Sequence, residues 1–324
     1  MKKYKIYDNV LIGKNSTIGD YAIIGKPPRG FKNGDLYTRI GLNAVIREFS
    51  VIYASARIGN SFQSGIGVRI RENNIIGNDV SIGTNAVLEF SNRIGNGVRI
   101  HSNCFMEMAT IEDFVFIAPN VVMTDDPHPM GCPKWKECKG GVTIKAYSRI
   151  GANTTLLPGI TIGRNCLIGA GSVVTENIRD DSVAYGNPAT VEKNIKDLKC
   201  HMGFYDKVYD WPPYTNADVH YRDDRRKFMR LNCPVFVRYG HTRDFFSTIN
   251  FNDQGVRIPS EKKLKPGQLL DLEILAKEDR LIECQAKVIW CSKEKNKYGH
   301  YEAGMIFANI TEEDLEVIKH ELQG

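Results

Sequence analysis

Branched aliphatic residues recur every six positions over most of the first half of the chain. They occupy Ile40, Ile46, Ile52 and Ile58, return in the same phase from Ile70 to Ile100, and continue at Ile111, Ile117, Ile144, Ile150, Leu156, Ile162, Ile168 and Val174. Neither a helix nor a strand has a period of six, whereas the stacked coils of a parallel β-helix do. The sequence therefore predicts one short strand and one turn per hexad, three hexads per coil, and the aliphatic side chain pointing inward.

The composition is that of a soluble protein with enough chain for two domains. The chain has 324 residues, of which 42% are hydrophobic and 25% charged, and its formal net charge is +5. This mild basic excess favours anionic ligands such as nucleotides and does not indicate a DNA-binding protein. No apolar run is long enough to span a membrane, and no signal peptide follows Met1. We therefore expect a cytoplasmic protein with reduced cysteines.

Breaks in the period divide the chain. Two stretches rich in proline, glycine or acidic residues, 26–39 and 123–141, interrupt the hexads and are predicted to be loops that project from corners of the coil. The hexads end near Val174. We expect a β-helical domain over residues 1–195, a linker over 196–220 and a second domain over 221–324.

The second domain has the pattern of a small antiparallel β-barrel with a terminal helix. Strands are predicted at 234–239, 244–249, 255–258, 269–275, 283–290 and 301–307. Thr311, with Asp314 three residues later, is predicted to cap a final helix over 312–322.

The hexads resemble those of the hexapeptide-repeat acyltransferases, which fold as left-handed parallel β-helices. This resemblance covers residues 1–195 and implies transfer of an acyl group from acetyl-CoA, or another acyl-CoA, to a sugar or sugar nucleotide. It also implies a homotrimer with active sites between neighbouring coils.

His128 is the first candidate for the catalytic base. The Ile117-Ala118-Pro119-Asn120 hexad leads into a loop in which a histidine precedes a proline, and this stretch is similar to the galactoside and maltose O-acetyltransferases. The resemblance implies that His128, as a neutral imidazole, removes the proton of the acceptor. Asp125 and Asp126 are expected to orient or polarise it, and Trp135 to contact the substrate.

His101 is the second candidate, because it occupies a hexad position where glycine stands in most other repeats. With three hexads per coil, Gly83 is expected one coil below it and Ala118 one coil above. The amino-sugar N-acetyltransferases, which the coil also resembles, line their acceptor site with polar residues of this coil. That resemblance implies that His101 and Asn103 bind the acceptor or supply the base. Glu107, six residues after His101, is a candidate partner for it by its spacing.

The acyl carrier is expected along the last coils. In the acyltransferases that the hexads resemble, backbone groups of the last coils bind the pantetheine arm of the cofactor. A Gly-Asn-Pro-Ala turn lies beside its nucleotide. The residues of this chain at those positions are Ala152, Ala170, Thr175, Gly186, Asn187 and Pro188. Because Thr190 stands where many members have arginine, Lys193 is expected to contact phosphate instead.

Metal chemistry has weaker support. A γ-type carbonic anhydrase needs three histidines for its zinc ion, and the coil has only two before residue 200. A metal or disulfide role for Cys132 and Cys138 stays open, but their spacing matches no strong ligand motif. The sequence therefore predicts no metal site.

The second domain resembles the PilZ domains, which are receptors for cyclic di-GMP. Arg226 and Arg230 form an Arg-x-x-x-Arg motif beside Arg225, and the stretch from Asn250 through Asn252 to Gly255 is similar to the second PilZ motif, with Asn252 where serine is usual. Arginine forks suit both phosphates and the acceptor edge of guanine. The resemblance implies that these residues bind cyclic di-GMP.

These resemblances together predict an acyl-CoA-dependent enzyme under cyclic di-GMP control. It would modify an amino or hydroxyl group of a sugar, a sugar nucleotide or an exopolysaccharide precursor. The alternative is a non-catalytic trimeric β-helix scaffold that presents PilZ adaptor domains.

Overall fold

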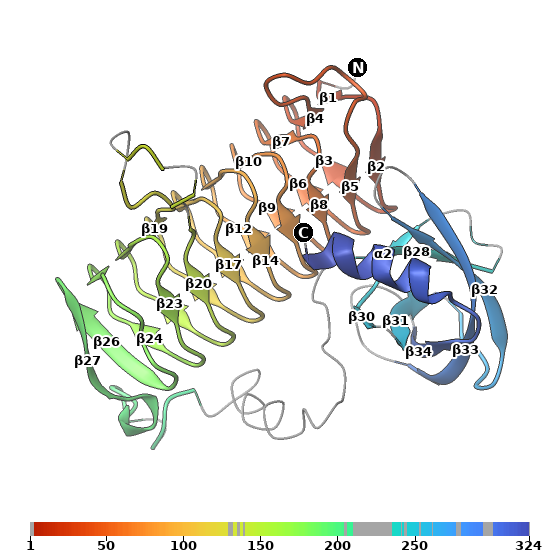
Figure 1. Cartoon of the computed structure of the whole chain (residues 1–324). Coiled ribbons are helices and arrows are strands. Elements are labelled where there is room, and N and C mark those ends of the chain that lie inside the picture. Colours follow the sequence, from red (N-terminus) through yellow and green to blue (C-terminus); the bar gives the residue numbers. More distant parts are fainter. Residues whose placement is uncertain are drawn as a thin grey trace.

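The structure, a computed structural model, describes residues 3–128, 132–134, 137, 138, 140–203, 206–209, 235–240, 242, 245–252, 254–260, 262–276, 280–293 and 301–323. These residues are mainly β. A parallel β-helix comes first, and an antiparallel sheet with helix α2 lies beside its N-terminal half (Figure 1). The fold class predicted from the hexads is confirmed.

Three parallel sheets form the faces of the β-helix. The first sheet contains β1 (Lys5–Ile6), β4 (Ile23–Lys26), β7 (Val51–Tyr53), β10 (Arg69–Ile70), β13 (Val87–Leu88), β16 (Phe105–Met106), β19 (Val122–Met123), β22 (Thr155–Leu156) and β25 (Val173–Val174). The second contains β2 (Val10–Ile12), β5 (Thr38–Ile40), β8 (Arg57–Ile58), β11 (Ile75–Ile76), β14 (Arg93–Ile94), β17 (Thr110–Ile111), β20 (Thr143–Ile144) and β23 (Thr161–Ile162). The third contains β3 (Thr17–Ile18), β6 (Val45–Ile46), β9 (Gln63–Ser64), β12 (Ser81–Ile82), β15 (Arg99–Ile100), β18 (Phe116–Ile117), β21 (Arg149–Ile150) and β24 (Leu167–Ile168), and ends in the hairpin of β26 (Ser182–Gly186) and β27 (Ala189–Asn194).

The period of six arises because the second residue of each short strand points into the coil. Ile70 and Ile76 are fully buried, and Ile82 is 2% exposed. Each stacks on its counterpart in the next coil, as in the pairing of Ile70 with Leu88. Burying such a side chain contributes about 1.5–3 kcal/mol, so the ladder forms one continuous core along the axis.

Asparagine is frequent in the turns for a backbone reason. Left-handed φ angles between 54° and 62° occur at Asn43, Asn73, Asn85, Asn103, Asn120, Asn153 and Asn165. Asparagine tolerates this region better than most residues with a side chain. The Asn103 conformation is therefore a feature of the repeat as well as of any site.

A second row of polar side chains links the coils at the corner between the second and third sheets. The Oδ1 atom of Asn78 accepts the backbone N–H of Asn60 at 2.8 Å, and the Oδ1 atom of Asn96 accepts that of Asn78 at 2.8 Å. The row ends at Asp113, whose Oδ1 atom accepts the N–H of Asn96 at 2.6 Å. Burial, together with the nearby charge of Glu112, raises the pKa of Asp113 to about 6 despite the opposing hydrogen bond from Asn96.

Replacing Asp113 by asparagine should stabilise the chain at neutral pH. The pKa of this carboxyl is about 6 in the folded chain against 3.8 for an ordinary exposed aspartate, so the folded form holds its proton more tightly. Stability therefore falls as pH rises through this window and stays lower above it. At pH 7.5, Asp113→Asn should gain about 1–2 kcal/mol, measured as a melting-temperature increase of a few degrees by circular dichroism.

The gain should disappear near pH 4, where the native carboxyl is largely protonated and resembles the amide. Asp20→Asn, at an exposed position of the first coil, controls for a general effect of removing negative charge. If the melting temperatures of Asp113→Asn and the native chain differ by the same amount from pH 4 to pH 8, ionisation of Asp113 does not destabilise the fold.

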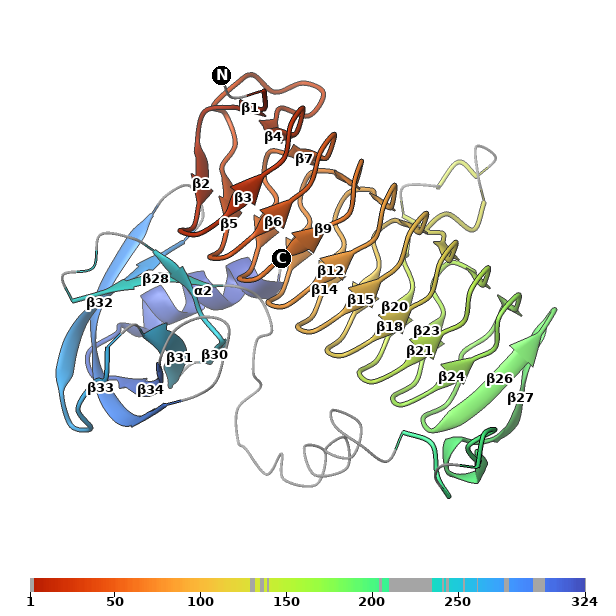
Figure 2. The ribbon, with the colours of Figure 1, turned by 180° about the vertical axis from the view of Figure 1, so that it is seen from behind.

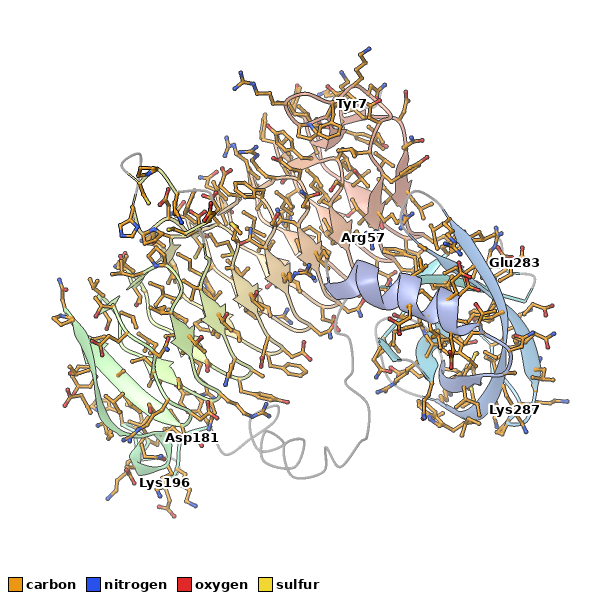
Figure 3. All side chains as sticks on the ribbon, viewed as in Figure 1. Tyr7, Arg57, Asp181, Lys196, Glu283 and Lys287 are labelled. Atoms are coloured by element: carbon orange, nitrogen blue, oxygen red, sulfur yellow. The ribbon has the colours of Figure 1, made fainter. Side chains whose placement is uncertain are left out.

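The described part of the second domain is one antiparallel sheet that curls into half a barrel, as Figure 2 shows from behind. Its strands are β28 (Phe236–Tyr239), β29 (Phe246–Ser247), β30 (Asn250–Asn252), β31 (Gly255–Ser260), β32 (Leu269–Leu275), β33 (Leu281–Ser292) and β34 (Tyr301–Phe307), in the order β29-β28-β32-β33-β34-β31-β30. Along β33, Glu283 and Lys287 are exposed, whereas the alternate residues are buried (Figure 3).

The terminal helix covers this half-barrel. It runs as α2 from Glu312 to Gln323, and the buried side chain of Ile318 packs it into the core of the domain. The hydroxyl of Thr311 accepts the N–H of Asp314 at 3.1 Å, which confirms the predicted cap. None of the helices among the described residues has the length and apolar character needed to cross a bilayer.

The second domain contacts the second sheet of the β-helix near its first coils. The Arg39 guanidinium donates from Nη2 to the carbonyl oxygen of Ala276 at 2.8 Å, and the Asn78 amide donates to that of Thr248 at 3.0 Å. Leu42, a coil residue, belongs to the apolar core of the second domain. Both ribbon views place this domain beside the early coils (Figures 1 and 2).

Candidate active site

The predicted interruption of the coil after Met123 is a loop that projects from the corner between the first and second sheets (Figure 1). This excursion loop covers residues 124–142, between β19 and β20. Its base is closed by the N–H of Gly140, which donates to the carbonyl oxygen of Asp125 at 2.9 Å. At its end, a Cβ atom on Gly141 would lie 2.0 Å from the carbonyl oxygen of Met108, so only glycine lets the chain re-enter the coil there.

His128 lies exposed on this loop. Its backbone N–H donates to Oδ1 of Asp126 at 2.9 Å, so Asp126 fixes the main chain at His128. Asp125 is buried, with 6% exposure, and it contributes through the loop closure described above. Trp135 lies outside the described residues, and the catalytic role of His128 stays a prediction.

Two cysteines of the excursion loop lie beside His128. One ligand atom from each of His128, Cys132 and Cys138 can be chosen so that all three lie within 4.8 Å of one another. The sequence predicts no metal here, because the spacing of the cysteines fits no common motif. The loop conformation, which the spacing does not reveal, brings these three groups together.

His101 lies at a different corner, where the third sheet turns into the first. Its backbone N–H donates to the carbonyl oxygen of Ile117 at 2.9 Å, and the ring packs against Phe116 with centroids 4.9 Å apart. The coil below contributes Gly83, where a Cβ atom would lie 2.5 Å from the carbonyl carbon of His101. His101 is exposed, so its imidazole is available to a ligand. We call the corner between the third and first sheets the ridge of His101.

Glu107 was expected to partner His101, but the strand β16 separates them. It follows Met106 and therefore lies at the corner between the first and second sheets, on the side of the excursion loop. Since one hexad spans one face, residues six positions apart occupy successive corners. Glu107 is thus better placed to act with the loop of His128 than with His101.

The predicted carrier residues also divide between these two corners. Ala152 and Ala170 lie in successive coils at the corner of His101, and the carbonyl oxygen of Ala152 accepts the N–H of Gly171 at 2.8 Å. Thr175 follows β25 and is exposed at the corner of the excursion loop.

The Gly-Asn-Pro-Ala segment is the turn of the β26–β27 hairpin, in which Gly186 pairs with Ala189. Gly186 has φ of 112°, which favours glycine, and its N–H donates to Oγ of Ser172 at 3.2 Å. This contact places the exposed Asn187 and Pro188 at the corner of His101 and Ala170. Lys193 is exposed on β27, away from the turn, where it pairs with Val183.

The predicted ligand residues of the second domain are only partly described. Arg225, Arg226 and Arg230 lie outside the described residues. Asn250 and Asn252 lie on the edge strand β30, two residues beyond Thr248, which contacts the coil.

Gly255 is buried where β31 meets β34, and a Cβ atom there would lie 2.0 Å from the carbonyl oxygen of Met305. Packing therefore explains this glycine without a ligand. The ligand-binding roles of these residues stay predictions.

Comparison with known proteins identifies two segments of the chain. Residues 141–176 match the family described as bacterial transferase hexapeptide (six repeats), and residues 222–324 match the PilZ domain. The galactoside O-acetyltransferase of Escherichia coli K12 is 40% identical over 100 residues, which cover 30% of this chain and 49% of that protein. The dTDP-3-amino-3,6-dideoxy-alpha-D-galactopyranose 3-N-acetyltransferase of Aneurinibacillus thermoaerophilus is 39% identical over 70 residues, covering 22% of this chain and 36% of that protein.

Among solved structures, a hexapeptide-repeat acetyltransferase of Vibrio cholerae complexed with acetyl coenzyme A is 25% identical. It aligns with 39% of this chain and 72% of its own, at a TM-score of 0.35. The chain spans about half, or less, of the length of the two curated relatives named above.

Proposed function

We propose that this chain, which joins a hexapeptide-repeat acetyltransferase region to a C-terminal PilZ domain, transfers an acetyl group from acetyl-CoA to a sugar. The acceptor would be an amino or hydroxyl group of a sugar, a sugar nucleotide or an exopolysaccharide precursor. The observation that carries this proposal is the interrupted coil, in which one projecting loop presents His128. The similarity to a galactoside O-acetyltransferase and to a sugar-nucleotide N-acetyltransferase supports the same class of acceptor.

The reaction needs a base at the acceptor and a groove for the carrier. A neutral imidazole takes the proton of the acceptor group while the oxygen or nitrogen of that group attacks the thioester carbon. The tetrahedral oxyanion forms, held by backbone N–H groups. The carbon–sulfur bond then breaks, and the imidazolium returns the proton to the CoA thiolate. His128 is the first candidate for this base and His101 the second.

The placement of the site residues supports an oligomer. Within one chain, the first sheet separates the loop of His128 from the ridge of His101, Ala152 and Ala170. A neighbouring copy can set its ridge against the loop and complete the site. We therefore propose a homotrimer in which each site takes its loop from one chain and its carrier groove from the next.

Alanine variants should identify the base. His128→Ala is expected to lower turnover about 10²–10⁴-fold, because general base catalysis contributes that much, while CoA binding by calorimetry stays unchanged. His201→Ala, at another exposed histidine, is the control. If His101→Ala alone has this effect, the base is His101. If neither variant changes turnover with a panel of amino sugars and galactosides, the site assignment is wrong.

Mixing two inactive variants should test the shared site. His128→Ala removes the loop function, and Ala170→Trp blocks the carrier ridge. Random trimers of the two should regain about a quarter of native activity, because some sites receive an intact loop and an intact ridge from different chains. Co-expression with two affinity tags, followed by an acetyl-transfer assay, measures this. No recovery in verified mixed trimers would place the site within one chain.

We also propose that cyclic di-GMP regulates transfer through the contact between the two domains. The motif residues Asn250 and Asn252 begin two positions after Thr248, whose carbonyl oxygen accepts the Asn78 amide of the coil. A ligand that moves β30 would therefore change the contact of the second domain with the second sheet. The Arg226 and Arg230 motif would supply the phosphate contacts.

Calorimetry with cyclic di-GMP tests this regulation. Arg226→Ala should weaken binding at least about tenfold, since a charge-assisted hydrogen bond is lost. Leu42→Asp, which disrupts the domain contact, should bind the ligand normally while turnover stops responding to it. Ile66→Asp, at an exposed apolar residue of the coil, is the control. An undiminished response in Leu42→Asp would exclude this route, and undiminished binding in Arg226→Ala would exclude the motif.

A further inference from the structure

The excursion loop gathers three side chains that favour the same kind of metal ion. His128 offers an imidazole nitrogen, and Cys132 and Cys138 each offer a sulfur, all within 4.8 Å of one another. Thiolate and imidazole together suit zinc better than magnesium or calcium, which prefer oxygen. His128 and Cys138 are exposed and Cys132 is half-buried, so an ion can reach them from solvent.

Local backbone structure presents these ligands from one short stretch of chain. Asp126 accepts the N–H of His128 and turns the chain at the first ligand. The carbonyl oxygen of Lys134 accepts the N–H groups of Glu137 at 2.8 Å and Cys138 at 3.1 Å, forming a turn that orients the third ligand. The closure between Gly140 and Asp125 fixes both ends of the stretch.

The spacing of the three groups suits a tetrahedral ion. Zinc holds sulfur at about 2.3 Å and nitrogen at about 2.0 Å, which sets the ligand atoms roughly 3.5–3.8 Å apart. The three groups would need to close by about 1 Å, a small change for side chains on a projecting loop.

A negative charge also lies near the sulfurs. The pKa of the Cys138 thiol is raised by desolvation, by a hydrogen bond with Cys132 and by the charges of Cys132 and Asp126. Asp126 therefore contributes a negative charge that favours a cation on this part of the loop.

We propose that His128, Cys132 and Cys138 form a zinc-binding site, with a water molecule completing the tetrahedron. The site lies on the loop that carries the candidate base, so metal binding has a consequence for catalysis. An imidazole that donates one nitrogen to zinc keeps its proton on the other and has no lone pair left to act as a base. If His128 is the base, as the proposed function holds, zinc binding switches transfer off.

Metal binding itself is tested without an activity assay. The full chain, purified with reductant and freed of metal by a chelator, should bind about one Co²⁺ or Zn²⁺ per chain, with the near-ultraviolet absorption of thiolate-bound cobalt. Cys132→Ser, Cys138→Ser and His128→Ala should each weaken binding at least about tenfold. Cys200→Ser, at another half-buried cysteine, should bind like the native chain.

Alkylation followed by mass spectrometry gives a second readout. Bound zinc should protect Cys132 and Cys138 from a maleimide and leave Cys200 reactive. Several outcomes would overturn the site: no stoichiometric binding, binding that survives both serine variants, or a Cys132–Cys138 disulfide as the purified form together with no metal uptake after reduction.

The catalytic consequence has a separate test. One equivalent of zinc should lower native turnover at least about tenfold, because the base is withdrawn, and should leave the Cys132→Ser/Cys138→Ser variant active. Confirmed metal binding with turnover unaffected would refute the inhibition and point to His101 as the base, while the metal site would stand. A chain with no transfer activity would leave the binding and alkylation results intact as a test of the site.

Discussion

The structure depends on the in-register stacking of one coil on the next. Every strand of the β-helix pairs in parallel with its counterparts in the adjacent coils, so a residue inserted within a strand would turn its inward side chain outward. Variation is confined to the corners. The turn before β17 loses one residue, and the excursion loop adds a whole segment before β20, yet Ile94, Ile111 and Ile144 still pair in sequence. The candidate site residues therefore lie at the corners, because the chain tolerates insertions and deletions there without losing the strand register.

Much of this architecture could be predicted because its determinants repeat. The hexads located the inward residues and both loops, and strand-like runs located β32 and β34 at their bounds. The Thr311 cap located the terminal helix to within one residue. Strand β30 was missed because Asn250 and Asn252 do not look like strand residues. Its place at the sheet edge comes from pairing with β31, a tertiary interaction that local propensity does not report.

The candidate site was harder to predict than the fold. Residue types and the family resemblance suggested His128 and His101. The division of the site residues between two corners, with Glu107 on the side of the excursion loop, becomes visible only when the faces of the coil are counted. The proximity of Cys132 and Cys138 to His128 depends on turns of an aperiodic loop. Spacing rules for metal sites describe common motifs and give no information about such a loop.

The chain leaves the β-helix at its last coil, near Lys196 and Asp181, whereas its second domain lies against coils near the other end, around Arg57 (Figure 3). In a solenoid, each repeat is supported only by its neighbours, so unwinding begins most easily at the termini. The β26–β27 hairpin covers one terminus, and the second domain braces the early coils through Leu42 and Asn78. Loss of this contact would therefore make it easier for the first coils to unwind. The second domain is thus positioned to set the cooperativity with which the whole β-helix unfolds.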